Sequence, residues 1–220
     1  MQRYTAIAIL ECLAALGAFR ATPLARGETL DRIAVTVGRH VISEHDILQD
    51  IRLSAFIDSK QPDFSAEQKR KAADRLIDQY LVLQDAASTR TPMPSVSDVA
   101  AMLAPIKARY TSDQGYRSAL LQARITDAEL AEHLLAGLRM LRYTDLRFRP
   151  EVEITEDALR AYYDKLTASA GNTSPRPTFE ASRNDIEKLL TEQQTMQALD
   201  RWLSTVRGET AVVYHEAAFK

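Results

Sequence analysis

Hydrophobic residues recur at helical spacing in the segment AADRLIDQYLVLQDA, which spans residues 72–86. The pattern predicts an amphipathic helix that begins at Ser65 and ends near Ser88. Its apolar stripe consists of Ala73, Leu76, Ile77, Tyr80, Leu83 and Ala87. We expect this helix to lie at the centre of the core.

The segment before this helix alternates between apolar and polar residues, with a period of two. Residues 31–42 alternate and are rich in β-branched side chains, with Gly38-Arg39 as the interruption. This pattern predicts a hairpin, or two strands around a tight turn. Ile33, Val35 and Val37 share one parity of this alternation. Residues 211–214 form another short extended segment, which is not stable as an isolated strand, so we expect it to pair with the hairpin.

The rest of the chain predicts capped helices. Ser43 to Asp46 and Thr126 to Glu129 have the form of capping boxes. Further helices are expected after Ser95 or Ser97, after Thr111-Ser112-Asp113, after Thr155, and from Phe179 onwards, where Gly208 is predicted to end the last helix as its C′ residue. The predicted fold is therefore mainly α, a multi-helix core with a small β-sheet formed by the N-terminal hairpin and the C-terminal strand.

The first residues have the pattern of an export signal. Arg3 precedes a mostly apolar run from Ala6 to Phe19, which suits the h-region of a signal peptide and is shorter than the roughly 20 residues of a membrane span. Small residues near position 27 predict cleavage before Glu28. We therefore expect a signal peptide over residues 1–27 and a mature domain over residues 28–215. An ordinary N-terminal helix or an uncleaved anchor is the alternative.

Composition narrows the function classes. A hydrophobic content of 45% and a charged content of 26% are those of a soluble globular protein. The net charge of −2 does not indicate nucleic-acid binding. The single cysteine, Cys12, lies within the predicted signal peptide, so the mature chain would have no disulfide and no thiolate catalyst.

No motif for catalysis or cofactor binding is present in the sequence. The four histidines lack the i, i+4 spacing of a helical metal site, and no glycine-rich loop opens a helix to hold phosphate. A Gly-x-Ser-x-Gly nucleophile elbow is also missing. The sequence therefore predicts no catalytic residues, no cofactor and no metal.

The order of the predicted elements resembles that of SurA-type periplasmic chaperones, the SurA N-terminal domain family (trigger factor/SurA-like). The resemblance is carried by LDRIAVTVGRHVISEHDI (30–47), AADRLIDQYLVLQDA (72–86), the capped helix 126–147 and EVEITEDALRAYYDK (151–165). The last helix and strand, residues 179–214, resemble the segment that returns to the N-terminal domain in this family.

One feature of that family is missing. Its members commonly insert one or two parvulin-type prolyl isomerase domains between the helix with paired tyrosines and the last helix. Only residues 164–178 lie there in this chain, whereas such a domain needs about a hundred residues. The resemblance therefore covers the chaperone core alone, divided into residues 30–149, a link and helix over 150–168, a loop over 169–178, and residues 179–215.

The resemblance implies an ATP-independent periplasmic chaperone, not an enzyme, that binds unfolded exported proteins, in particular outer-membrane proteins, through apolar surface. Adaptable apolar side chains suit such a surface, and they are concentrated in residues 93–121. The candidate client-binding residues are Met93, Met102, Ile106, Tyr110, Tyr116 and Leu120. The alternatives are a peptidyl-prolyl isomerase relative without its catalytic domain, and a scaffold protein anchored in the inner membrane.

Overall fold

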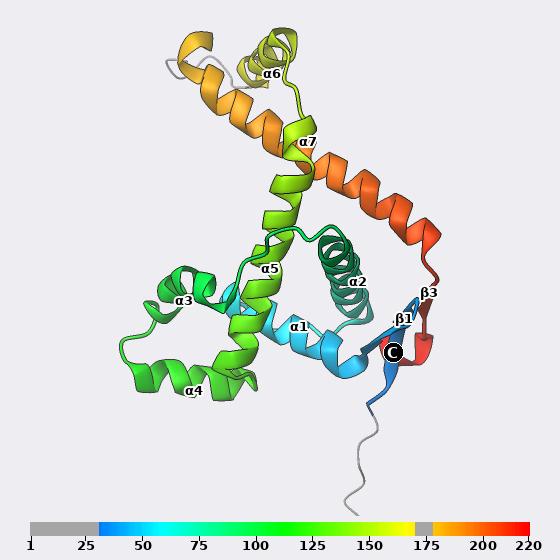
Figure 1. Cartoon of the computed structure of the whole chain (residues 1–220). Helices are drawn as coiled ribbons and strands as arrows, with labels where there is room; N and C mark the ends of the chain where they lie inside the picture. Colours follow the sequence, from blue (N-terminus) through cyan, green and yellow to red (C-terminus); the bar gives the residue numbers. More distant parts are fainter. Residues whose placement is uncertain (1–30, 170–177) are drawn as a thin grey trace, which may run out of the picture. The chain divides into compact units, whose positions relative to one another are not determined.

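The computed structural model describes residues 31–169 and 178–220. Within these ranges the chain forms seven α-helices and one three-stranded antiparallel sheet (Figure 1). The mainly helical fold with a small sheet is the predicted one. The predicted signal peptide, residues 1–27, lies outside the described residues, as does most of the predicted loop 169–178.

The sheet joins the two ends of the described chain. Strands β1 (Ile33–Val37) and β2 (His40–Ser43) form a hairpin whose turn contains Gly38 with a positive φ of 58°. Strand β3 (Val212–Tyr214) pairs antiparallel with β1, which gives the order β2-β1-β3. Figure 1 shows the C-terminal end of the chain beside β1. The predicted pairing of the last strand with the hairpin is confirmed.

An irregularity in the hairpin interrupts the alternation of its buried side chains. The register between β1 and β2 shifts between Ile33 and Val35. A shift of one residue in the register changes the face of the sheet on which the next side chains along the strand lie. Val35 and Val37 are buried, but Ile33, which shares their parity in the sequence, is 45% exposed, and Ala34 is buried. The three residues of one parity in the sequence therefore do not all lie on the buried face.

Helices α1 (Glu44–Ile57) and α2 (Ala66–Ser88) begin where their polar caps predict. The Ser43 hydroxyl accepts a hydrogen bond from the Asp46 amide, and the Asp46 carboxylate accepts one from the Ser43 amide, which completes the capping box. The Ser65 hydroxyl caps α2 by accepting a hydrogen bond from the Gln68 amide. These local interactions satisfy amide groups that have no partner within the helix.

The buried side of α2 differs from the predicted stripe. The hairpin, α1, α5 (Asp127–Arg147) and α7 (Phe179–Glu209) all contact α2, so its burial is decided by several neighbours. Its buried residues are Lys69, Ala72, Ala73, Ile77, Leu81, Val82 and Ala86. Ala87 is exposed, and Leu76, Tyr80 and Leu83 are only half-buried. Of the predicted stripe, Ala73 and Ile77 are fully buried.

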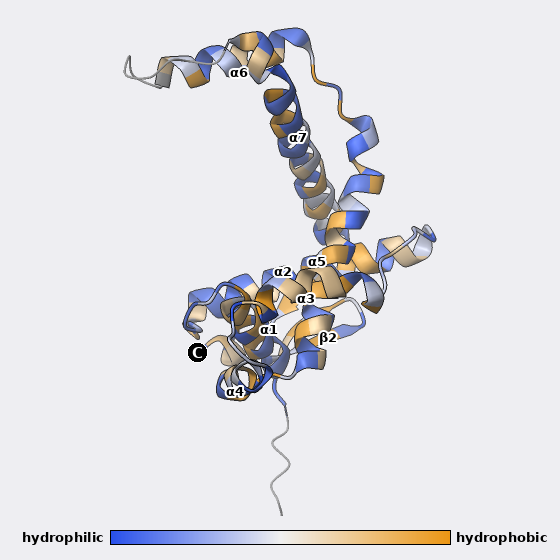
Figure 2. Cartoon of the chain, turned by 90° about the vertical axis from the view of Figure 1, so that its left-hand side faces the viewer, coloured by the Kyte–Doolittle hydropathy of each residue, from blue (hydrophilic) through white to orange (hydrophobic). Residues whose placement is uncertain are grey.

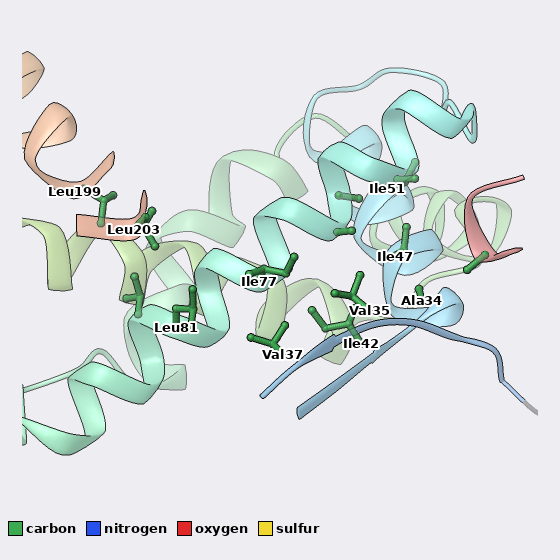
Figure 3. Packing of buried hydrophobic residues seen from close by; sticks show 14 of the residues in the cluster. Ala34, Val35, Val37, Ile42, Ile47, Ile51, Ile77, Leu81, Leu199 and Leu203 are labelled. Atoms are coloured by element: carbon green, nitrogen blue, oxygen red, sulfur yellow. The ribbon is translucent and has the colours of Figure 1, made fainter. Parts of the chain in front are cut away.

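Two hydrophobic clusters organise the described chain. The first combines the sheet, α1, α2, the end of α5, and α7. In Figure 3, Val35, Val37 and Ile42 of the hairpin point toward Ile77 and Leu81 of α2.

The second cluster lies among α1, α5 and two short helices, α3 (Ala100–Lys107) and α4 (Asp113–Ala123). A 3₁₀ helix, Val96–Val99, leads into α3, and Pro105 lies within α3.

Helix α7 connects α6 to the first cluster. Its first half packs against α6 (Glu156–Ser169), where the rings of Tyr163 and Phe179 meet edge to face. Hydrophobic residues are scattered along α7 among many hydrophilic ones (Figure 2). Near its other end Trp202 packs against Tyr143 and Phe148, with ring centroids 5.5 and 6.1 Å away.

The predicted end of α7 is wrong by a short distance. The helix continues through Gly208 to Glu209, and Gly208 does not have a positive φ. Thr210 is the cap residue, with an extended backbone that leads directly into β3. A left-handed glycine is not needed because the chain leaves the helix in an extended conformation.

Polar interactions hold the C-terminal segment against α2. Arg207 donates to Asp74 at 3.0 Å and to Asp78 at 2.8 Å, and the Tyr214 hydroxyl donates to Asp74 at 2.6 Å. Lys69 is buried, and its ammonium group donates to Glu44 at 3.1 Å and to the Ala218 carbonyl at 3.2 Å. A buried ammonium needs such partners because its desolvation is costly. These contacts complete the return of the chain to the hairpin.

Candidate functional site

The six candidate client-binding residues lie in the cores rather than on one open surface. Ile106, Tyr116 and Leu120 are buried in the second cluster, and Met102 and Tyr110 pack half-buried against it. Met93 packs half-buried against the first cluster and is therefore separated from the other five.

The chemistry of these residues is that of a packed interior. Tyr116 packs edge to face on Tyr110 with centroids 5.6 Å apart, and its hydroxyl donates to Asp127 at 2.5 Å. A buried tyrosine with a satisfied hydroxyl stabilises a fold. In this conformation an open apolar surface must come from other residues.

Such a surface is present as a cleft bounded by β2, α1, α2 and α5. Its volume is about 490 Å³, and the area lining it is mostly apolar. Clefts that bind ligands commonly enclose about 300–1,000 Å³ and are mostly apolar with a few polar groups. Leu76, Tyr80 and Leu83 of α2 line one wall, and Val41 and Ile42 of β2 line another. Three of the four stripe residues that are not fully buried therefore line this cleft.

The β2 wall of the cleft is an outer strand of the sheet. Among the described residues β2 pairs only with β1. A strand at a sheet edge presents backbone N–H and C=O groups that can pair with another extended chain. Val41 is 45% exposed on this strand, and the His40 ring stacks on the Tyr80 ring with centroids 4.1 Å apart. An apolar wall and a strand edge thus lie together.

A buried acidic residue is among those that line the cleft. Asp50 is 2% exposed and pairs with Arg75, whose Nε donates to Oδ2 at 3.2 Å. The other oxygen, Oδ1, has no hydrogen-bond partner and is 3.6 Å from Nδ1 of His133. Burial lowers the pKa of His133 below its ordinary value, Asp50 opposes this shift and Arg75 adds to it.

The other charged residues of the cleft are acidic and are held in place by the helix starts. Asp46 and Glu129 are the carboxylates of the capping boxes of α1 and α5. Burial favours the neutral form of Glu129, but hydrogen bonds from the Thr126 amide and hydroxyl outweigh it and lower the pKa of this carboxyl. Glu132, one turn further along α5, completes the acidic set.

A smaller hollow of about 430 Å³ lies on another side of α1 and has the opposite charge. Its charged lining residues are Arg52, Lys60 and Arg124, and its aromatic ones include Phe56 and Phe64. The Arg52 guanidinium lies over the Phe64 ring at 5.5 Å from its centroid. The hollow is more polar than the first cleft, and it contains no strand edge.

Sequence periodicity could not separate cleft residues from core residues. Leu76, Tyr80 and Leu83 have helical spacing in both cases, and the difference depends on which neighbours cover them. A usable signal was present in the breadth of the pattern, because the additional apolar residues Leu81 and Val82 widen it beyond what one neighbour can bury. The spacing predicts Asp46 and Glu129 as capping residues, which they are, but it does not predict that both lie at the cleft.

In the described part of the chain, no group of three or more His, Cys, Asp or Glu side chains is arranged to hold a metal ion. Within residues 31–169 and 178–220, no helix is long and apolar enough to cross a membrane.

The fold defines a mainly helical protein whose small antiparallel sheet is completed by a returning C-terminal strand. A scan against models of known protein families finds no match, and a search of curated proteins finds none either. The chemistry of the cleft is therefore the basis for assigning a function.

Proposed function

We propose that this chain is an ATP-independent chaperone that holds unfolded exported polypeptides, such as outer-membrane proteins, in the periplasm. The observation that carries the proposal is the open apolar cleft beside the outer strand β2. The signal-peptide pattern of residues 1–27 supports export. The resemblance of the sequence to SurA-type chaperones supports the same class.

The mechanism follows from the two walls of the cleft. An unfolded outer-membrane strand alternates apolar and polar side chains over about ten residues. When such a segment lies along the edge of β2, its backbone pairs with the strand, and every second side chain points the same way. These apolar side chains would contact Leu76, Tyr80 and Leu83. Backbone pairing is independent of sequence, so many different clients can bind.

The proposal is tested by suppression of aggregation. A bacterial porin unfolded in urea is diluted into buffer with and without the protein, and light scattering is followed. Removing apolar surface from the cleft with the double variant Val41→Ser and Leu83→Ser should weaken client affinity roughly tenfold, because about 1–2 kcal/mol of apolar contact is lost. Circular dichroism and thermal unfolding confirm that the variant remains folded.

A matched control uses apolar residues that are exposed elsewhere. Val96 and Leu121 are 59% and 77% exposed and do not line the cleft. The double variant Val96→Ser and Leu121→Ser should suppress aggregation as well as the unchanged protein. If both double variants lose the suppression of aggregation to the same extent, the cleft is excluded as the client site. No suppression by the unchanged protein would refute the chaperone function itself.

A further inference from the structure

The charges at the apolar cleft have one sign, and from this we infer that it selects client segments in which a lysine or arginine adjoins apolar residues. The inference deepens the proposed function and rests on it. The formally charged lining residues are Asp46, Asp50, Glu129 and Glu132. No lysine or arginine lines the cleft. A cleft with low-dielectric walls and one sign of charge attracts groups of the opposite sign.

The acidic groups are fixed before a client arrives. Asp46 accepts hydrogen bonds from the Ser43 amide at 2.8 Å and from its hydroxyl at 2.9 Å. Glu129 accepts them from the Thr126 amide at 2.6 Å and from its hydroxyl at 2.9 Å. Neither carboxylate has to be ordered when a cation binds, so little conformational entropy is lost.

Asp50 indicates independently that the cleft accepts a hydrogen-bond donor from a bound client. Its carboxylate is buried, lines the cleft, and leaves Oδ1 as the one buried side-chain atom without a hydrogen-bond partner in the described chain. Arg75 satisfies the other oxygen, and His133 lies beyond hydrogen-bond distance at 3.6 Å. An unsatisfied buried acceptor is unfavourable and is usually paired. The ammonium or guanidinium group of a client is a suitable donor for it.

The hollow on the other side of α1 is basic, so a lysine or arginine of a client is expected to bind at the first cleft and not there. Arg52, Lys60 and Arg124 would repel the same basic segment. The outer strand β2 and the acidic residues are found together only at the first cleft among the described hollows. A basic apolar segment is therefore directed to the strand edge.

Three peptides test the inference with the full chain. They have the same alternating apolar residues and differ at the polar positions, which are lysine, glutamine or glutamate. Affinity is measured by fluorescence anisotropy of labelled peptide at low and at physiological salt. The lysine peptide should bind roughly two- to fivefold more tightly per added charge than the glutamine peptide, in the range of exposed ion pairs, and the glutamate peptide more weakly. The preference should decrease as salt is added.

Variants locate the selecting charges. Glu132 is exposed, so Glu132→Gln should leave the fold intact and reduce the preference for lysine, and Glu132→Lys should reduce it further. Asp50→Asn keeps the size of the buried side chain and should also reduce it. Glu153→Gln is the matched control, since Glu153 is exposed and does not line the cleft; it should leave the preference unchanged.

The outcomes separate the inference from the proposed function. Equal binding of all three peptides, or an unchanged preference in Glu132→Lys, would overturn the charge selection while leaving a chaperone. Failure of all three peptides to bind, together with no suppression of porin aggregation, would overturn the function. A lysine preference that decreases in Glu132→Gln but not in Glu153→Gln would establish the inference.

Discussion

At the scale of single residues, neighbouring positions of α2 have different roles. Ile77 is fully buried among the hairpin and α1, whereas Leu76 is half-buried and lines the cleft. Truncating Ile77 leaves an enclosed cavity, but truncating Leu76 only enlarges an open one. The cost of a large-to-small change depends on how completely the site is enclosed.

We therefore expect Ile77→Ala to lower the free energy of unfolding by about 2–5 kcal/mol, the range for buried aliphatic side chains. Leu76→Ala should cost clearly less. Urea unfolding followed by the fluorescence of Trp202, the single tryptophan, measures both values. Trp202 packs on Tyr143 and reports on the first cluster. An equal cost for the two variants would contradict the assignment of Leu76 to the cleft.

At the scale of elements, the return of the chain depends on the pairing of β3 with β1. The Gly38 amide donates to the Ala211 carbonyl at 2.8 Å, and the His215 amide donates to the Ala34 carbonyl at 2.8 Å. These two bonds enclose the paired strands at both ends. Arg207 and Tyr214 connect the same segment to Asp74 of α2. Strand pairing and helix packing therefore stabilise each other.

His215→Pro removes the amide that Ala34 requires and should lower the free energy of unfolding by about 1–3 kcal/mol, the cost of an unsatisfied buried acceptor. Hydrogen exchange at the Gly38 amide should become faster, because β3 detaches from β1. His215→Ala keeps the amide and loses only the contact between its ring and the Thr36 hydroxyl at 3.1 Å. Unchanged exchange at Gly38 in the proline variant would show that β3 stays paired with β1 without the His215 amide.

At the scale of the whole molecule, stability should depend on pH through His133. Burial lowers the pKa of this side chain from its ordinary value of 6.5. As the pH decreases through 6.5, the unfolded chain takes up a proton at this position before the folded chain does. The free energy of unfolding should therefore decrease below that pH, and this contribution should stop decreasing once the folded state is protonated as well.

Urea unfolding at intervals between pH 7 and pH 5 measures this contribution. In this window the carboxylates with lowered pKa, such as Glu129, are mostly charged in both states and contribute less than His133. His133→Gln cannot take up the proton, so its stability should vary less over the same interval. If the variant has the same pH dependence of stability as the unchanged protein, His133 is not the cause of that dependence.

Local interactions explain why so much of the fold was predictable. Capping boxes at Ser43 and Thr126 and the turn at Gly38 involve residues close in sequence, so the starts of α1 and α5 and the hairpin follow from it. The pairing of β3 was predictable because a short strand needs a partner. The end of α7 was not, since Gly208 can lie within a helix as well as end one.

The client site could not be predicted in the same way. The candidates between residues 93 and 121 share an apolar character, but α4 packs against α1, and the second cluster buries Ile106, Tyr116 and Leu120. The cleft that remains open combines side chains of β2, α1, α2 and α5, which only the tertiary fold brings together.

The sequence by itself thus determined where helices and strands begin and that the last strand returns to the first. The tertiary structure alone decided which apolar residues are enclosed and which remain open, including the two fates of Ile77 and Leu76. The physical reason is that caps and turns depend on a few adjacent residues, whereas burial depends on every element that packs around a position.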